Sequence, residues 1–260
     1  MIRDLKGLLG SRVFAVDGEV GKVEDFYFDA EKWTLRYFVV QTGDWLLGRR
    51  VLVSAAAFSK PRPRTGIVSV NFTKETIANS PEVGCAPLAR WQEKELHDYY
   101  GWDPYWEEAE MDIIPPLGNE FNAALGAISP FLHEDGRDEI AALHSIRNLR
   151  GARIEALDGP IGHLDTFMVD DHGWVIRYAA IDTHAWLQGK KVVLACQWIT
   201  DVQSGGGTGK VLVHLTREKI EQGPEYRVDI DLDRAYEEQL CAHYDQERYW
   251  VPEWDEQRVA

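Results

Sequence analysis

Short runs of apolar, β-branched and aromatic residues, separated by turn signals, are the main pattern of the chain. Asp17-Gly18 lies between two such runs, and this dipeptide supplies the positive φ angles that a tight hairpin turn needs. Residues 34–40 and 51–54 have the composition that is typical of strands. Thr73 stands where the N-cap of a short helix would stand. The pattern therefore predicts a mainly β structure with a few short helices.

The pattern of the first hundred residues is repeated in the second half of the chain. A shift of 141 residues aligns residues 8–51 with residues 149–192 without a gap, so that Trp33 meets Trp174. Shifts of 143 and 144 continue the match through the rest of the unit. A colinear set of this kind predicts a tandem duplication into two small domains. The expected division is residues 1–106, a linker rich in Pro, Gly and Glu at 107–143, and residues 144–260.

Many short strands in a unit of this size suit a closed barrel, because closure removes exposed strand edges. Each unit ends in a predicted helix, at residues 90–100 and 234–244, followed by a tail that is rich in aromatic residues. We therefore expect two small β-barrels in tandem, each followed by short α-helical and aromatic tail segments. The tails are expected to pack in or near the contact between the two units.

The runs DGEVGKVEDFYFD and DGPIGHLDTFMVD, followed by WTLRYFVVQT and WVIRYAAIDT, resemble the PRC-barrel domain. The segments that end the two units, LARWQEKELHDYYGWDPYW and LDRAYEEQLCAHYDQERYW, are similar to the tails of bacterial tandem PRC-barrel proteins. This family resembles the cytoplasmic domain of the photosynthetic reaction centre H subunit. The resemblance implies two PRC-type barrels and a role in docking onto a larger assembly. The sequence shows no counterpart of the N-terminal membrane helix of the H subunit.

The charge balance and the lack of long apolar runs narrow the class of partner. The 260 residues carry 28 Lys and Arg against 43 Asp and Glu, a net charge of -15, which disfavours nucleic acid because phosphates are bound by clustered cations. No apolar run approaches the roughly 20 residues of a membrane-spanning helix, and the start shows no signal-peptide pattern. The spacing of the three cysteines fits neither a metal site nor a CxxC pair, so free thiols are expected. These features predict a cytoplasmic protein.

The candidate docking residues belong to an aromatic and cationic loop in each unit and to the two aromatic tails. Each loop combines a tryptophan, a glycine and two adjacent cations, and Trp and Arg are frequent at binding hot spots. The alternative is that the tryptophan caps the end of its barrel, with solvated cations beside it. The tail aromatics either dock a partner or pack the tail back onto the barrel. The candidates are Trp45, Arg49, Arg50, Trp186, Lys190 and Lys191 in the loops, and Tyr100, Trp106, Tyr244 and Trp250 in the tails.

The sequence offers no pattern that is typical of catalysis, of a cofactor or of a metal site. Asp170, Asp171 and His172 form the most evident ligand cluster, but the spacing fits no zinc motif, and no metal is expected. No nucleophile elbow or triad spacing is present. His97 and His243 are expected on solvated faces of their helices. We therefore expect no cofactor.

These observations favour a non-enzymatic protein that acts as a protein-docking or assembly module. Its expected partner is another protein or a second copy of itself, as a homo-oligomer, and a peripheral contact with a membrane complex is compatible with the resemblance. The alternative is a small-ligand- or metal-binding enzyme with its site between the two barrels. A deep polar pocket between the units would favour that alternative.

Overall fold

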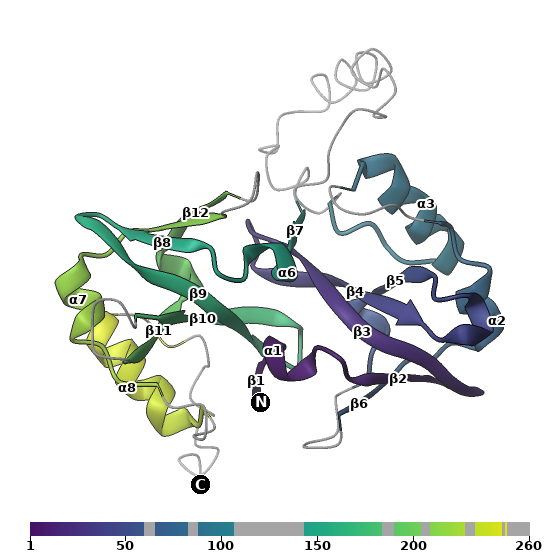
Figure 1. The fold of residues 1–260 in the computed structure, drawn as a ribbon, viewed down its shortest axis with the longest axis horizontal. Helices are drawn as coiled ribbons and strands as arrows, with labels where there is room; N and C mark the ends of the chain where they lie inside the picture. Colours follow the sequence, from purple (N-terminus) through teal and green to yellow (C-terminus); the bar gives the residue numbers. More distant parts are fainter. Residues whose placement is uncertain are drawn as a thin grey trace, which may run out of the picture.

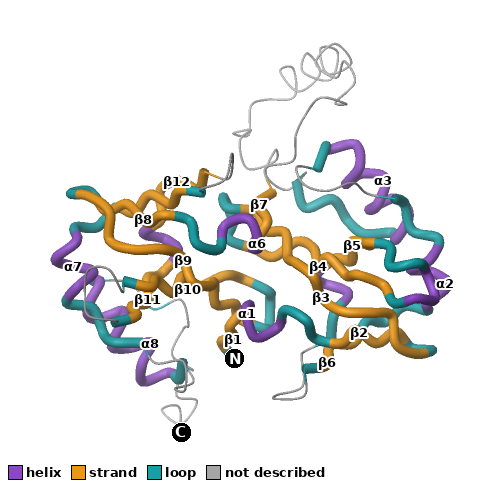
Figure 2. The backbone as a smooth tube through the Cα atoms, in the orientation of Figure 1, coloured by secondary structure: helices purple, strands orange, loops and turns teal. Residues whose placement is uncertain are grey.

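A computed structural model describes residues 1–59, 66–82, 88–106, 143–183, 190–203, 209–226, 232–245 and 248 (Figure 1). In this part of the chain the structure is mainly β, with a 13-stranded sheet and short helices. The helices α2 (Lys74–Ala78) and α3 (Arg90–Tyr100) lie at one end of the molecule, and α7 (Arg217–Glu221) and α8 (Arg234–Tyr244) lie at the other (Figure 2). No helix among the described residues is long and apolar enough to cross a membrane.

The two halves of the chain contain corresponding elements. The first half contains β1 (Ile2–Asp4), α1 (Leu5–Leu8), β2 (Arg12–Ala15), β3 (Gly18–Asp29), β4 (Thr34–Thr42), β5 (Arg50–Ser54) and β6 (Ile67–Ser69). The second half contains β7 (Leu143–Ser145), α6 (Ile146–Leu149), β8 (Arg153–Ala156), β9 (Gly159–Asp170), β10 (Val175–Asp182), β11 (Lys191–Ala195), β12 (Ile199–Gln203) and β13 (Lys210–Val213). Short 3-10 turns follow some strands, namely η1 (Asp44–Leu46), η2 (Ala55–Ala57) and η3 (Cys196–Trp198).

The strands pair in the same way in both halves. In the first half, β2, β3, β4 and β5 pair antiparallel in sequence order, and β6 runs parallel to β2. In the second half, β8, β9, β10 and β11 pair antiparallel in sequence order, and β13 runs parallel to β8. The hairpins turn at the predicted Asp-Gly dipeptides, where Gly18 and Gly159 have φ angles of 142° and 132°. The strand order that follows each hairpin is therefore the same.

A second glycine in each half lets two strands approach closely. A Cβ at Gly21 would lie 2.0 Å from the carbonyl oxygen of Gln41, and a Cβ at Gly162 would lie 2.3 Å from that of Asp182. No side chain fits at either position, so β3 and β9 can each cross the end of the next strand only with glycine there. The repeated Gly pattern is thus explained by strand packing.

The two halves exchange a strand. β1 of the first half pairs antiparallel with β9, and β7 of the second half pairs antiparallel with β3. The registers correspond, because Ile2 lies opposite Asp170 and Leu143 lies opposite Asp29. A contact between β4 and β10 joins the halves a third time. The strands of the two halves therefore belong to one sheet.

Trp33 and Trp174 lie at this joint and adopt the left-handed conformation, with φ angles of 51° and 55°. The carbonyl of Trp174 accepts a hydrogen bond from the N–H of Leu35 at 2.9 Å, and the carbonyl of Trp33 accepts one from the N–H of Ile176 at 2.6 Å. Trp174 is only 6% exposed, and its ring meets Phe38 of the other half edge-on at 4.9 Å. Each turn thus reaches across to the opposite half.

The hydrophobic core is continuous through both halves. Its main cluster contains side chains from the strands of both halves, and the ring centres of Phe28 and Phe167 lie 5.4 Å apart across the joint. A second cluster lies between α3 and the sheet, and it includes Leu143 from β7 of the second half. The burial of apolar surface therefore stabilises the two halves together.

Candidate binding sites

The predicted loop of the first half holds two apolar side chains at the surface. Trp45 lies in η1, is 37% exposed, and donates its indole N–H to the carbonyl of Val20 at 2.7 Å. The ammonium of Lys74 lies 4.3 Å from the centre of the indole ring. Leu47 follows with a φ of 53° and is 97% exposed. Leu47 is not among the docking residues predicted from the sequence, although its place directly before the turn glycine, Gly48, is a signal that the sequence contains.

Two of the predicted docking cations serve the fold. Arg49 donates to the carbonyls of Ala78 at 2.9 Å and Ser80 at 2.5 Å, beside the end of α2. Lys190 donates to the carbonyls of Glu221 and Gly223, both at 2.7 Å, beside the end of α7. A cation at the C-terminus of a helix satisfies carbonyls that have no partner within the helix. The same contact, made twice, explains why both loops carry a cation at this position.

The next cation of each loop contributes to a network between the halves. Arg50 pairs with Glu24 at 2.7 Å, and Glu24 also pairs with Arg147 of the second half at 2.7 Å. In the corresponding place Asp165 pairs with Lys191 at 2.5 Å and with Lys6 of the first half at 2.9 Å. Each network therefore places one carboxylate between a cation of its own half and a cation of the other half.

The aromatic tail of the first half packs on its own half. Tyr100 stacks on Trp102 with ring centres 4.3 Å apart, and Trp106 meets the ring of His97 at 4.6 Å. In the second half, Tyr244 is only 2% exposed. Trp186 and Trp250 lie outside the described residues. Trp45 is therefore the most exposed predicted docking aromatic in the described part of the chain.

A buried polar cluster fixes α3 on the sheet. Glu93 is fully buried, accepts a hydrogen bond from the hydroxyl of Tyr105 at 2.7 Å, and pairs with Arg90 at 2.5 Å. His97 is 6% exposed, and its Nε2 lies 2.8 Å from the hydroxyl of Tyr37. The prediction that His97 lies on a solvated face was wrong, because it follows Glu93 by one helical turn and so faces the sheet.

Burial shifts the titration of this cluster toward its uncharged forms. It raises the pKa of Glu93, and the hydrogen bond from Tyr105 and the charge of Arg90 offset only part of that effect. It lowers the pKa of His97, so the imidazole stays neutral in the folded protein around neutral pH. α8 has a related contact, in which the hydroxyl of Tyr178 donates to Glu237 at 2.9 Å. Each of the two helices is therefore joined to its sheet by a strand tyrosine that contacts a polar side chain of the helix, Tyr37 with His97 and Tyr178 with Glu237.

A pocket of about 740 Å³ lies between the two halves. One wall comes from the start of β4, from η2 and from the tail that follows α3, and the other comes from residues 171–174 of the second half. The rings of Tyr37, Trp102, Tyr105 and Trp174 line it, together with the carboxylates of Asp103 and Asp171. This volume lies within the range of small-molecule sites.

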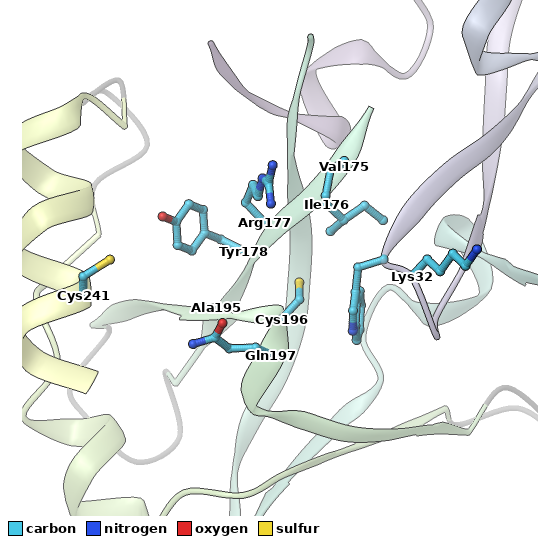
Figure 3. A pocket seen from close by; sticks show the side chains of 10 residues that line it. Lys32, Val175, Ile176, Arg177, Tyr178, Ala195, Cys196, Gln197 and Cys241 are labelled. Atoms are coloured by element: carbon cyan, nitrogen blue, oxygen red, sulfur yellow. The ribbon is translucent and has the colours of Figure 1, made fainter. Parts of the chain in front are cut away.

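The corresponding place in the second half forms a smaller pocket of about 210 Å³ (Figure 3). Residues of β10, η3 and α8 line it, together with Lys32 and Trp33 of the first half. Cys196 and Cys241 come from different sides of this pocket (Figure 3), and both are free thiols. Burial raises the pKa of both thiols, which opposes formation of the reactive thiolate.

The cluster of Asp170, Asp171 and His172 does come together, with one ligand atom of each residue within 4.8 Å of the others. Cations of the first half already contact it. The amino group of Met1 lies 2.9 Å from Asp171, and Nε of Arg3 lies 2.5 Å from the same carboxylate. Burial raises the pKa of Asp171, but these two hydrogen bonds outweigh it, so the pKa lies below its usual value. In this arrangement the cluster serves as an ion-pair site between the halves.

The comparisons with known proteins identify one part of the chain. Residues 3–77 match the PRC-barrel domain family, from β1 to α2. No curated protein matches the chain. At the level of the family, this domain suggests a module for protein interaction or assembly. The first half of the chain therefore contains a PRC-barrel domain at residues 3–77.

Proposed function

We propose that the chain is a non-enzymatic docking module built from two PRC-type halves, related to the cytoplasmic domain of the reaction centre H subunit. The corresponding elements, pairings and registers of the two halves support a second PRC-type unit after residue 143. The partner is another protein, bound by the loop of η1 in the first half. An enzyme with its site between the halves is the second candidate, and the pocket of about 740 Å³ favours it.

The exposure of Leu47 is the observation that carries the docking proposal. Its side chain is 97% exposed, and it lies next to Trp45 on a loop that hydrogen bonds hold in place. An exposed apolar side chain gains free energy when a partner covers it, and a loop already in its bound shape loses little entropy on binding. The neighbouring Trp45 adds an aromatic side chain to the same surface, and tryptophan is enriched at binding hot spots.

The test is a capture experiment with a matched pair of variants. Leu47→Asp should abolish co-purification of the partner from the native cell extract, because it places a charge in the buried centre of the contact. Leu157→Asp is the control, since Leu157 is 61% exposed on the hairpin of the second half. Equal capture by wild type and Leu47→Asp would contradict a role for this loop.

A further inference from the structure

We infer that the larger pocket between the halves receives an arginine side chain of a partner protein. This inference rests on the docking role proposed above in one respect, namely that the bound cation belongs to a protein. It uses a different surface, because the pocket lies at the start of β4 and the loop of Leu47 follows the end of that strand. The two sites can therefore be tested separately.

The lining of the pocket suits a planar organic cation. Five aromatic rings line it, those of Tyr37, Phe58, Trp102, Tyr105 and Trp174, and aromatic faces attract guanidinium groups. Asp103 is exposed at this pocket, and no cation pairs with its carboxylate among the described residues. Asp171 is already paired with Arg3, so Asp103 is the carboxylate that is available to an incoming charge. The net charge of -15 also favours the approach of a basic partner.

One ring of the pocket, Tyr105, and one ring of the tail outside it, Trp106, already bind guanidinium groups of the chain itself, and the first of these groups, that of Arg36, also lines the pocket. The guanidinium carbon of Arg36 lies 3.8 Å from the centre of the Tyr105 ring, and that of Arg90 lies 4.8 Å from the centre of the Trp106 ring. Arg36 is paired with Asp29 at 2.9 Å, which compensates its charge. The tail that follows α3 is thus a surface on which arginine side chains pack. Its Asp103 carboxylate has no cation partner among the described residues.

The smaller pocket of the second half can be compared with the larger pocket position by position. Ala55 and Ala56 line the larger pocket, whereas Cys196 and Gln197 stand at the corresponding positions of the smaller one. The rim of the larger pocket has Gly173, a residue without a side chain, where the smaller pocket has Lys32. Smaller side chains at these positions accompany the larger volume, about 740 Å³ against about 210 Å³. The first pocket is therefore the one with room for a side chain from outside.

The experiment uses the full chain, a Gly-Arg-Gly tripeptide blocked at both ends, and the same tripeptide with citrulline, which has the shape of arginine without its charge. The arginine peptide should shift the indole N–H signals of Trp102 and Trp174 in NMR spectra, and the citrulline peptide should bind about five-fold more weakly or less. Ala56→Gln, which inserts the side chain of the smaller pocket at an exposed position, should weaken binding by about the same factor.

Two control variants make the outcome specific. Gln197→Ala changes the smaller pocket and should leave the affinity unchanged, and so should Asp98→Asn, which removes an exposed charge of α3 outside the pocket. Asp103→Asn should weaken binding. No saturable shift, equal binding of the citrulline peptide, or equal effects of Asp103→Asn and Asp98→Asn would overturn the inference. Because the readout does not involve Leu47, a failure here leaves the docking loop standing, and a failure of the capture experiment leaves this pocket standing.

Discussion

Replacing Trp174 by alanine is expected to lower the free energy of unfolding by about 3–5 kcal/mol, the usual cost of removing a large buried aromatic side chain. Trp174 is 6% exposed and packs edge-on against Phe38. Because the indole belongs to the second half and Phe38 to the first, the cavity would open at the contact between them. The loss should therefore appear in the unfolding of the whole chain.

The measurement is urea unfolding of the full-length variant, with Trp33→Ala as the matched control. Trp33 occupies the corresponding position with the same backbone conformation, but its side chain is only partly buried. The loss in Trp33→Ala should therefore be smaller. A loss below about 1 kcal/mol in Trp174→Ala would show that the indole does not contribute to the joint.

Replacing Asp25 by alanine is expected to lower the free energy of unfolding by about 3 kcal/mol, because two buried donors and one partly buried donor would lose their acceptor. Asp25 is 7% exposed and accepts hydrogen bonds from the hydroxyl of Ser145 at 2.5 Å and from the backbone N–H of Arg147 at 2.9 Å. The third donor is the N–H of Phe26 at 2.7 Å. Two of the three donors belong to the second half, so this carboxylate fastens β7 and α6 to β3.

A pH series separates the charge of Asp25 from its hydrogen bonds. Burial raises the pKa of Asp25, and the hydrogen bonds offset part of that rise. The folded protein therefore binds this proton more tightly than the unfolded chain does, and wild type loses stability as the pH rises from the ordinary carboxyl range through the raised pKa. The stability of Asp25→Asn relative to wild type should rise over the same range. A relative stability that is constant with pH, or a loss in Asp25→Ala equal to that of an exposed acid, would contradict this account.

The sequence predicts the elements of this fold better than their partners. The repeat at 141 residues predicts the two Asp-Gly hairpins and the two tryptophans at corresponding positions, because local turn chemistry and strand composition determine these features. It does not predict the exchange of β1 and β7. Each of these strands has only three residues, and β3 and β9 offer equivalent edges in the two halves. The local pattern would therefore suit pairing within the same half as well as pairing with the other half.

The sequence likewise predicts candidate site residues better than it predicts their contacts. The sequence predicts Arg49 as a docking residue because a cation beside a tryptophan is typical of binding surfaces. In the structure its partners are carbonyls near the end of α2, about thirty residues further along the chain. Asp25 and Ser145 are unremarkable in the sequence and meet only because the halves exchange strands. Leu47 has a left-handed φ of 53° and is 97% exposed, and composition alone shows neither property.

The two halves of the chain complete each other's sheet and core, and cutting the connection between them is the direct test of this dependence. A protease site inserted within residues 107–142 of the full chain allows cleavage after folding, followed by size-exclusion chromatography under native conditions. With β1 paired to β9, β7 paired to β3 and a shared core, the two fragments should elute together at the position of the uncut chain and keep its unfolding transition. Elution as two separate folded fragments would contradict the claim.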